Sequence, residues 1–295
     1  MPGSLVRVLP ALLLVLPAAL TACGGGDGAA SADGGDHTAA PAEPRIEMAP
    51  TGPEELPPAI LGEGGAPQGM DLHYVDGDSA TTGYLAVPEG AGPFPAVLLI
   101  HEWNGVVDRI RQIADAFARE GYVALAVDLY QGRTGSNPEE NMALVRETRE
   151  DPEAMIANLN AAARTLRARP DVTGKVATMG WCFGGGVALS YALDGESHDG
   201  TAIFYGGLVD DPTRLASIHH EVYGTFAAED QGPSPEQVDG FVAALREAGV
   251  PNDVHIYDDV NHGFWLYVER DAEDARGPAL DAWQRLKAYL DRTLS

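Results

Sequence analysis

The residues with the clearest chemical potential form a glycine-rich turn around one cysteine. They read Gly180-Trp181-Cys182-Phe183-Gly184, the nucleophile-elbow pattern G-x-S-x-G with cysteine in place of serine. Such a turn joins a strand to a helix so tightly that the nucleophile is backbone-strained and its flanking positions must be small. The sulfur then lies at a helix N-terminus, whose partial positive charge favours the thiolate.

Two other interpretations of this turn are open. A buried structural cysteine could occupy a similar turn, and dinucleotides also bind at glycine-rich strand–helix junctions. A dinucleotide fingerprint needs G-x-G-x-x-G, however, whereas residues 180–186 read GWCFGGG. A nucleophile is favoured because an apolar strand at 175–180 precedes the motif and a helix at 187–193 follows it.

An acid and a histidine follow the cysteine in the chain order nucleophile, acid, histidine. Glu229 and Asp230 lie in the loop after a strand at 221–227, and Asp230 is the better candidate because it lies deeper in that loop. His262 follows the last strand, at 253–257. The remaining histidines lack the converging spacing of a metal site, and we expect neither a metal nor a cofactor.

The segment 100–105, IHEWNG, follows another apolar strand and should lie beside the cysteine. We expect the backbone N–H groups of Trp103 and Phe183 to form an oxyanion hole. His101 is not expected to act as the base, because it precedes the nucleophile in the chain.

Strands and helices alternate from about residue 71 onward, which predicts a doubly wound, mostly parallel sheet with helices on both faces. Residues 72–76 and 81–87 alternate like a hairpin. Further strands are expected at 96–100, 122–127, 175–180, 200–205, 221–227 and 253–257. Helices are expected over 107–120, from Pro138, from Pro152, and over 187–193, 235–248 and 273–293.

The N-terminus has the features of an export signal. Arg7 precedes an apolar stretch, 8–20, that is short and broken by two prolines, so it is a poor membrane-spanning helix. The stretch ends in Leu-Thr-Ala-Cys at Cys23, which resembles a bacterial lipobox, although an ordinary signal peptide could also contain a cysteine. We expect a lipoprotein signal peptide at 1–22 and acyl chains on Cys23 that anchor the protein to the outer face of the cell membrane.

Residues 23–66 should then be the lipidated cysteine and a disordered linker, because they are rich in Gly, Ala, Asp, Glu and Pro. The folded domain should span 67–295. The formal net charge of −25, from 19 Lys+Arg and 44 Asp+Glu, disfavours nucleic acid as a partner. No disulfide is expected, since Cys23 and Cys182 each belong to a separate motif.

The motifs together resemble the dienelactone hydrolase family over about residues 70–293. They are IHEWNG (100–105), VDLYQGR (127–133), MGWCFGGG (179–186), AAEDQ (227–231) and DDVNHGF (258–264). The resemblance implies a single-domain α/β-hydrolase fold with a triad of Cys182, Asp230 and His262, and with Glu102 touching the cysteine at rest. It also implies a small-molecule ester or lactone substrate, cleaved through an acyl-thioester that water hydrolyses.

Two positions depart from the family pattern. Members acting on dienelactone hold the substrate carboxylate with arginines, one just after the DLY motif and one shortly after the histidine. Here Arg133 is displaced by a residue or two, and the stretch 263–266 reads GFWL. We therefore expect Arg133 and Trp265 to bind substrate, and the substrate to be a more neutral or hydrophobic ester.

Two other functions are weighed against hydrolysis. The fold could serve as a non-catalytic binding scaffold in an envelope lipoprotein, but a binding protein does not need three triad residues in order. A peroxide-reducing thiol is less favoured, because a resolving cysteine is missing near Cys182.

Overall fold

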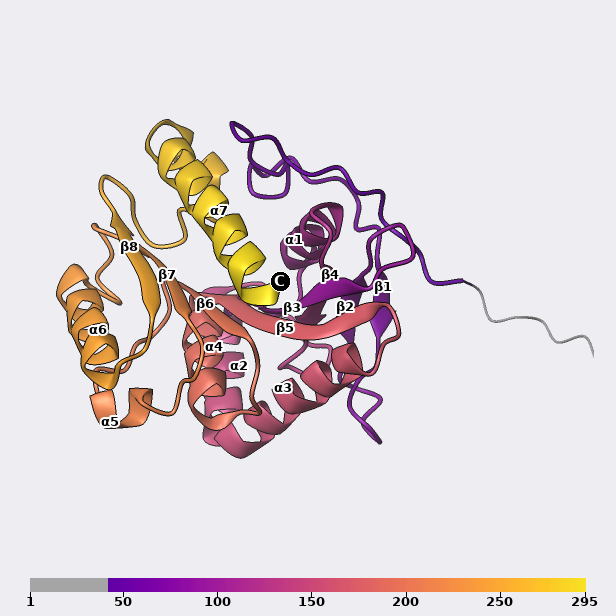
Figure 1. Cartoon of the computed structure of the whole chain (residues 1–295), viewed down its shortest axis with the longest axis horizontal. Coiled ribbons are helices and arrows are strands. Elements are labelled where there is room, and N and C mark those ends of the chain that lie inside the picture. Colours follow the sequence, from indigo (N-terminus) through magenta and orange to yellow (C-terminus); the bar gives the residue numbers. More distant parts are fainter. Residues whose placement is uncertain (1–41) are drawn as a thin grey trace, which may run out of the picture. The chain divides into compact units, whose positions relative to one another are not determined.

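One eight-stranded sheet forms the centre of the molecule. The computed structural model describes residues 42–295, and its strands are ordered β1-β2-β4-β3-β5-β6-β7-β8 (Figure 1). The strands are β1 (Met70–Leu72), β2 (Gly83–Ala86), β3 (Phe94–Ile100), β4 (Val123–Val127), β5 (Val172–Trp181), β6 (Gly200–Phe204), β7 (Val222–Ala227) and β8 (Asn252–Tyr257). The pairings of β2 with β1 and with β4 are antiparallel, and all others are parallel. The predicted mostly parallel sheet is confirmed.

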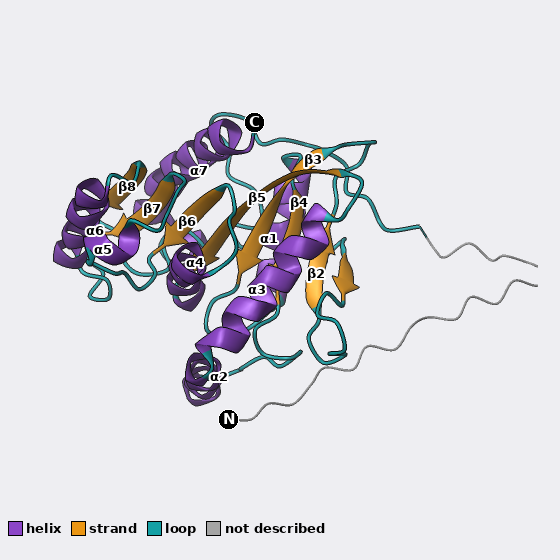
Figure 2. Cartoon of the chain, turned by 60° about the horizontal axis from the view of Figure 1, so that its bottom comes forward, coloured by secondary structure: helices purple, strands orange, loops and turns teal. Residues whose placement is uncertain are grey.

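Helices cover both faces of this sheet (Figures 1 and 2). One face packs against α1 (Asp108–Arg119) and α7 (Ala272–Leu294). The other packs against α3 (Pro152–Arg167), α4 (Phe183–Asp194) and α6 (Pro235–Ala248). Two further helices lie on this second face. Helix α2 (Pro138–Glu150) packs beside α3, and helix α5 (Pro212–Leu215) packs beside α6.

The central strands are apolar throughout because both of their faces are buried. In β3, Val97 and Leu99 join the core beneath α1 and α7, while Leu98 and Ile100 join the core beneath α3 and α4. This alternation follows from the two-residue repeat of a strand. It explains why these segments are continuous apolar runs instead of alternating ones.

The predicted helix starts and the hairpin are confirmed with small shifts. The Asn137 side chain accepts hydrogen bonds from the backbone N–H groups of Glu139 and Glu140 and so caps α2. Asp151 caps α3 in the same way through Ala154. The hairpin of β1 and β2 begins at Met70, two residues earlier than expected, and its first strand is shorter.

The prediction of a disordered linker is wrong for residues 42–66, which pack against the domain. Ile46 and Ile60 are buried in the core beneath α1 and α7, and the Ile46 N–H donates to the Val87 carbonyl at 2.8 Å. The Thr51 hydroxyl donates to Glu120 at 2.7 Å and accepts from the Trp283 indole at 2.8 Å. The average composition of the segment gave no sign of these few residues, each of which is stabilised by buried apolar area or by a hydrogen bond.

The predicted signal peptide, Cys23 and the rest of the predicted linker lie outside the described residues. Within 42–295, no helix is both long and apolar enough to cross a membrane. The same range holds no cluster of three or more His, Cys, Asp or Glu side chains that could bind a metal ion.

Candidate active site

Cys182 lies at a strained turn between β5 and α4. Its backbone has φ 54° and ψ −116°, a region that side chains other than glycine rarely occupy. A Cβ on Gly180 would lie 2.2 Å from the Gly184 carbonyl oxygen, and one on Gly184 would lie 2.2 Å from the Ile100 carbonyl oxygen. The two glycines are therefore needed to bring the turn against itself and against the end of β3.

His262 and Asp230 meet at the carboxyl ends of β8 and β7. The His262 Nδ1 lies 2.6 Å from an Asp230 carboxylate oxygen. The other Asp230 oxygen accepts the Gly232 N–H at 2.9 Å, which fixes the carboxylate. Asp230 is 7% exposed, whereas its neighbour Glu229 is exposed. The loop thus turns Asp230, and not Glu229, towards the histidine.

The surroundings of His262 favour its protonated form. Burial by itself would lower its pKa, but hydrogen bonds with Asp230 and Cys182 and the negative charges of both raise the pKa to about 10. Burial likewise opposes ionisation of Asp230, yet the hydrogen bonds from His262 and Gly232 hold the pKa of that carboxyl below its usual value. The pair can therefore hold an imidazolium at His262 beside a carboxylate at Asp230.

Two backbone N–H groups lie where an oxyanion hole would be expected. Phe183 begins α4 directly after the cysteine, and Trp103 lies in the turn after β3, whose last residue pairs with Gly180. Within the described part of the chain, neither N–H donates a hydrogen bond to another residue. The Tyr130 hydroxyl donates to the Trp103 carbonyl at 3.1 Å and so restrains that turn.

Glu102 is buried beside these groups, at 4% exposure. The resemblance implied contact with Cys182, and the two residues line the same cavity. The Glu102 carboxylate accepts a 2.7 Å hydrogen bond from the Tyr267 hydroxyl. Burial raises the pKa of Glu102, while this hydrogen bond and the positive charges of His262, Arg270 and Arg109 act in the opposite direction. Tyr267 was not predicted as a site residue, because nothing in its local sequence marks it as a partner of Glu102.

The cysteine opens into a cavity of about 470 Å³ whose lining combines polar and apolar surface in similar measure. Its walls come from the loop after β3, the segment leading into α2, the elbow and the loop after β8. The lining residues are Glu102, Trp103, Asn104, Gly135, Ser136, Asn141, Cys182, His262, Gly263, Tyr267 and Arg270. Arg270 belongs to the 3₁₀ turn η1 (Val268–Arg270), and its guanidinium lies 3.6 Å from the centre of the Tyr267 ring.

The expectation that Trp265 binds substrate is wrong. Its side chain is completely buried, and its ring packs on Trp181 and Phe204 at centroid distances of 5.7 and 4.7 Å. The apolar residues 264–266 after His262 therefore belong to the hydrophobic core. A cation does follow the histidine, eight residues later, as Arg270 in the cavity. The 3₁₀ turn brings it back towards the cysteine, which spacing alone did not reveal.

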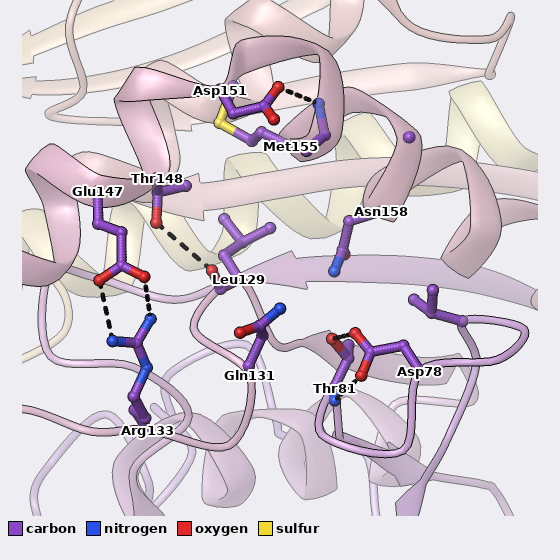
Figure 3. Close-up of a pocket in the computed structure, with 13 residues that line it drawn as sticks. Asp78, Thr81, Leu129, Gln131, Arg133, Glu147, Thr148, Asp151, Met155 and Asn158 are labelled. Carbon is purple, nitrogen blue, oxygen red and sulfur yellow. Dashed lines mark hydrogen bonds and ion pairs between the residues drawn. The ribbon is translucent and has the colours of Figure 1, made fainter.

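Arg133 also lies away from the cysteine. It lines a separate cavity of about 510 Å³ between the β1–β2 region, α2 and α3 (Figure 3). Its guanidinium forms two hydrogen bonds with Glu147, at 2.9 and 2.7 Å. The expected role of Arg133 at the Cys182 cavity is therefore not supported by its position, because its charge is already paired elsewhere.

Comparisons with known proteins identify the family of this chain. The family model described as "Dienelactone hydrolase family" matches residues 81–294. A Methylorubrum extorquens protein with a provisional carboxymethylenebutenolidase name is 28% identical over 226 residues, covering 72% of this chain and 77% of its own. "Protein usf" of Aquifex pyrophilus is 29% identical over 221 residues, covering 72% and 94%.

Solved structures show the same likeness. The structure named m3DLH is 28% identical, has a TM-score of 0.68, and covers 77% of this chain and 98% of its own. A dienelactone hydrolase-like promiscuous phosphotriesterase from metagenomic libraries shares the fold with a TM-score of 0.68 and the same coverage, at 23% identity. With the family model spanning most of the described residues, this chain belongs to the dienelactone hydrolase family and has its α/β-hydrolase fold.

Proposed function

We propose that the protein hydrolyses a carboxylic ester or lactone through a triad of Cys182, His262 and Asp230. The observation that supports this most directly is the 2.6 Å contact between the His262 ring and the Asp230 carboxylate. The same His262 side chain lines the Cys182 cavity. A buried carboxylate that orients a histidine beside a strained nucleophile is the arrangement that acyl transfer requires.

In the proposed reaction, the Cys182 thiolate attacks the carbonyl carbon, and the carbonyl electron pair moves onto oxygen. The N–H groups of Trp103 and Phe183 donate to this oxyanion. When the carbonyl re-forms, the C–O bond to the leaving alcohol breaks and protonated His262 supplies the proton that the alcohol needs. Neutral His262 then takes a proton from water, whose oxygen attacks the thioester, and the acid leaves as the thiolate and imidazolium return.

The cavity also refines the proposed substrate. The sequence favoured a neutral or hydrophobic ester, but the lining, which is polar and apolar in similar measure, contains the Arg270 guanidinium. No ion pair holds that guanidinium among the described residues. Arg270 is therefore suited to bind a carboxylate or a second carbonyl oxygen of the substrate.

Replacement of the nucleophile tests this proposal. Cys182→Ala should abolish hydrolysis of short p-nitrophenyl esters and simple lactones, and Cys182→Ser should lose most of it. Iodoacetamide should inactivate the wild-type protein, with the label on Cys182 when peptides are mapped. Full activity in Cys182→Ala would refute the mechanism, and a wild-type protein that is inert to every ester would favour the binding-scaffold alternative.

We also propose that the protein is exported and anchored through acyl chains on Cys23, after removal of residues 1–22. The support is the lipobox-like sequence before Cys23 and the apolar stretch that precedes it. Growth of a bacterial host with a clickable fatty acid should label the wild-type chain and Cys182→Ala, and should not label Cys23→Ala. Equal labelling of Cys23→Ala would exclude this anchor.

A further inference from the structure

Two asparagines in the Cys182 cavity have side-chain amides that serve no evident structural purpose. Asn104 lies in the loop after β3, two residues beyond Glu102, and Asn141 lies in α2. Asn141 is 6% exposed, and the amide oxygens of both residues are buried without a hydrogen-bond partner among residues 42–295. Buried amides are normally paired, so two residues with unpaired amide oxygens in the lining of one cavity point to a ligand.

The backbone of Gly135 contacts both asparagines. Its N–H donates to the Asn104 carbonyl at 3.2 Å, which ties the loop after β3 to the segment before α2. A Cβ at Gly135 would lie 1.9 Å from the Asn141 amide oxygen. Any side chain at position 135 would collide with the Asn141 amide oxygen, so the observed position of this amide requires glycine there.

Other asparagines near this region show what a structural role looks like. The Asn137 amide oxygen caps α2 through two backbone N–H groups. Asn158 donates to the Asp128 carbonyl and accepts from the Tyr74 hydroxyl. Asn104 and Asn141 have no comparable partners within the described part of the chain, so packing alone does not account for their amides.

We propose that Asn104 and Asn141 form a subsite for an uncharged hydroxyl group of the substrate, close to the carbonyl that Cys182 attacks. This inference rests on the proposed function and narrows its substrate class to hydroxylated esters or lactones. A hydroxyl can donate to one amide oxygen and accept from an amide N–H, which matches two neutral side chains. A carboxylate would be better placed on Arg270, and a cation on Glu102, both in the same cavity.

Paired lactones test the subsite. We would compare kcat/KM for γ-butyrolactone with that for its α-hydroxy and β-hydroxy derivatives, in the full-length wild-type protein, Asn104→Ala and Asn141→Ala. The wild type should prefer one hydroxylated lactone, and each variant should reduce that preference about tenfold. The intrinsic reactivity of each lactone cancels, because the measured quantity is the change in the ratio between proteins.

Asn137→Ala is the matched control, since it weakens the same end of α2 without removing a cavity side chain. It should keep the wild-type preference. Loss of the preference in Asn137→Ala to the same degree would overturn the subsite, because the effect would then follow from the placement of α2. Absence of any hydroxyl preference in the wild type, or its survival in both cavity variants, would also overturn it.

A second measurement does not require hydrolysis. 2-Pyrrolidinone and its 3-hydroxy and 4-hydroxy derivatives, as stable lactams, should protect Cys182 from iodoacetamide, followed by peptide mass spectrometry. One hydroxylated lactam should protect the wild type at a concentration at least about fivefold lower than the parent, and this advantage should vanish in Asn104→Ala and Asn141→Ala. If that pattern appears while no lactone or ester is cleaved, the subsite stands and the proposed hydrolysis fails; equal protection by all three lactams refutes the subsite.

Discussion

The Tyr267 hydroxyl donates a 2.7 Å hydrogen bond to the buried carboxylate of Glu102. Arg270 and Arg109 lie over the same tyrosine ring, at 3.6 and 5.3 Å from its centre. The carboxylate is thus supported by one hydroxyl and two nearby positive charges without forming a direct ion pair. This arrangement holds Glu102 to the side of the cavity formed by the loop after β8.

Tyr267→Phe should raise the pKa of Glu102 further, because the hydrogen bond that now opposes the effect of burial is lost. More of Glu102 will be protonated at neutral pH, so the acidic limb of the kcat/KM profile should move to higher pH, with activity at pH 7 about tenfold lower. Tyr122→Phe, which removes a hydroxyl bonded to Asp291 on α7, should leave the profile unchanged. An unshifted acidic limb in Tyr267→Phe would separate Glu102 from the chemistry.

His262 should make folding stability depend on alkaline pH. Its folded-state pKa of about 10 lies above the unfolded value near 6.5. A raised pKa contributes stability that is complete below the unfolded pKa and is lost as pH rises towards 10. Since the side chain is 35% exposed, we expect a screened contribution of ~1 kcal/mol. Urea unfolding at pH 6, 8 and 10 should show this loss of unfolding free energy in the wild type. In His262→Gln, the unfolding free energy should change less between pH 6 and pH 10.

Asp230→Asn should leave the fold intact and reduce kcat by about three orders of magnitude, because an amide can no longer hold the protonated imidazole. Glu229→Gln is a matched control one residue away, on an exposed side chain, and should retain wild-type kinetics. Steady-state rates of the two variants on a p-nitrophenyl ester decide whether Asp230 or Glu229 is the acid of the triad. A large loss in Glu229→Gln with a small one in Asp230→Asn would reverse the assignment of the acid.

The chain order of chemistry-bearing residues could be read from the sequence because each follows a buried strand. Parallel strands end at one edge of the sheet, so Cys182, Asp230 and His262 converge there if the strands are identified correctly. The elbow was equally readable, since the steric demand at Gly180 and Gly184 is local. The substrate-binding residues could not be read in this way.

Trp265 and Arg270 show why. A residue three positions past His262 was assigned by its distance along the chain. The chain turns repeatedly over 262–267, where Trp265 enters the core, and Arg270 reaches the cavity only from the following η1. Irregular loops have no periodicity from which side-chain direction can be inferred. The Asn104–Gly135–Asn141 grouping was hidden for a related reason, because it joins the loop after β3 to a segment and a helix that come later in the sequence.

Gly180 offers a test of the elbow, and a glycine-to-alanine change elsewhere that should be harmless serves as the control. Gly180→Ala would place a Cβ 2.2 Å from backbone at Gly184, so the turn must open. We expect a loss of activity of at least about a hundredfold, since displacement of a nucleophile by an ångström is costly. Gly240→Ala, in α6 with nothing within 4 Å of the new Cβ, should keep activity and raise stability by ~0.5–1 kcal/mol. A fully active Gly180→Ala protein would contradict the steric account.

Residues 42–66 should behave as part of the folded domain. Ile60 is 1% exposed in the core beneath α1 and α7, so Ile60→Ala should cost about 2–4 kcal/mol of unfolding free energy. Met48→Ala, at a side chain that is 45% exposed in the same segment, should change stability by less than ~0.5 kcal/mol. Chemical denaturation of the two full-length variants compares a buried and an exposed position of similar size. Equal stabilities would mean that the segment contributes nothing to folding. A selective loss in Ile60→Ala would mean that the domain needs residues well before 67, so that a fragment cut there would lack part of its core.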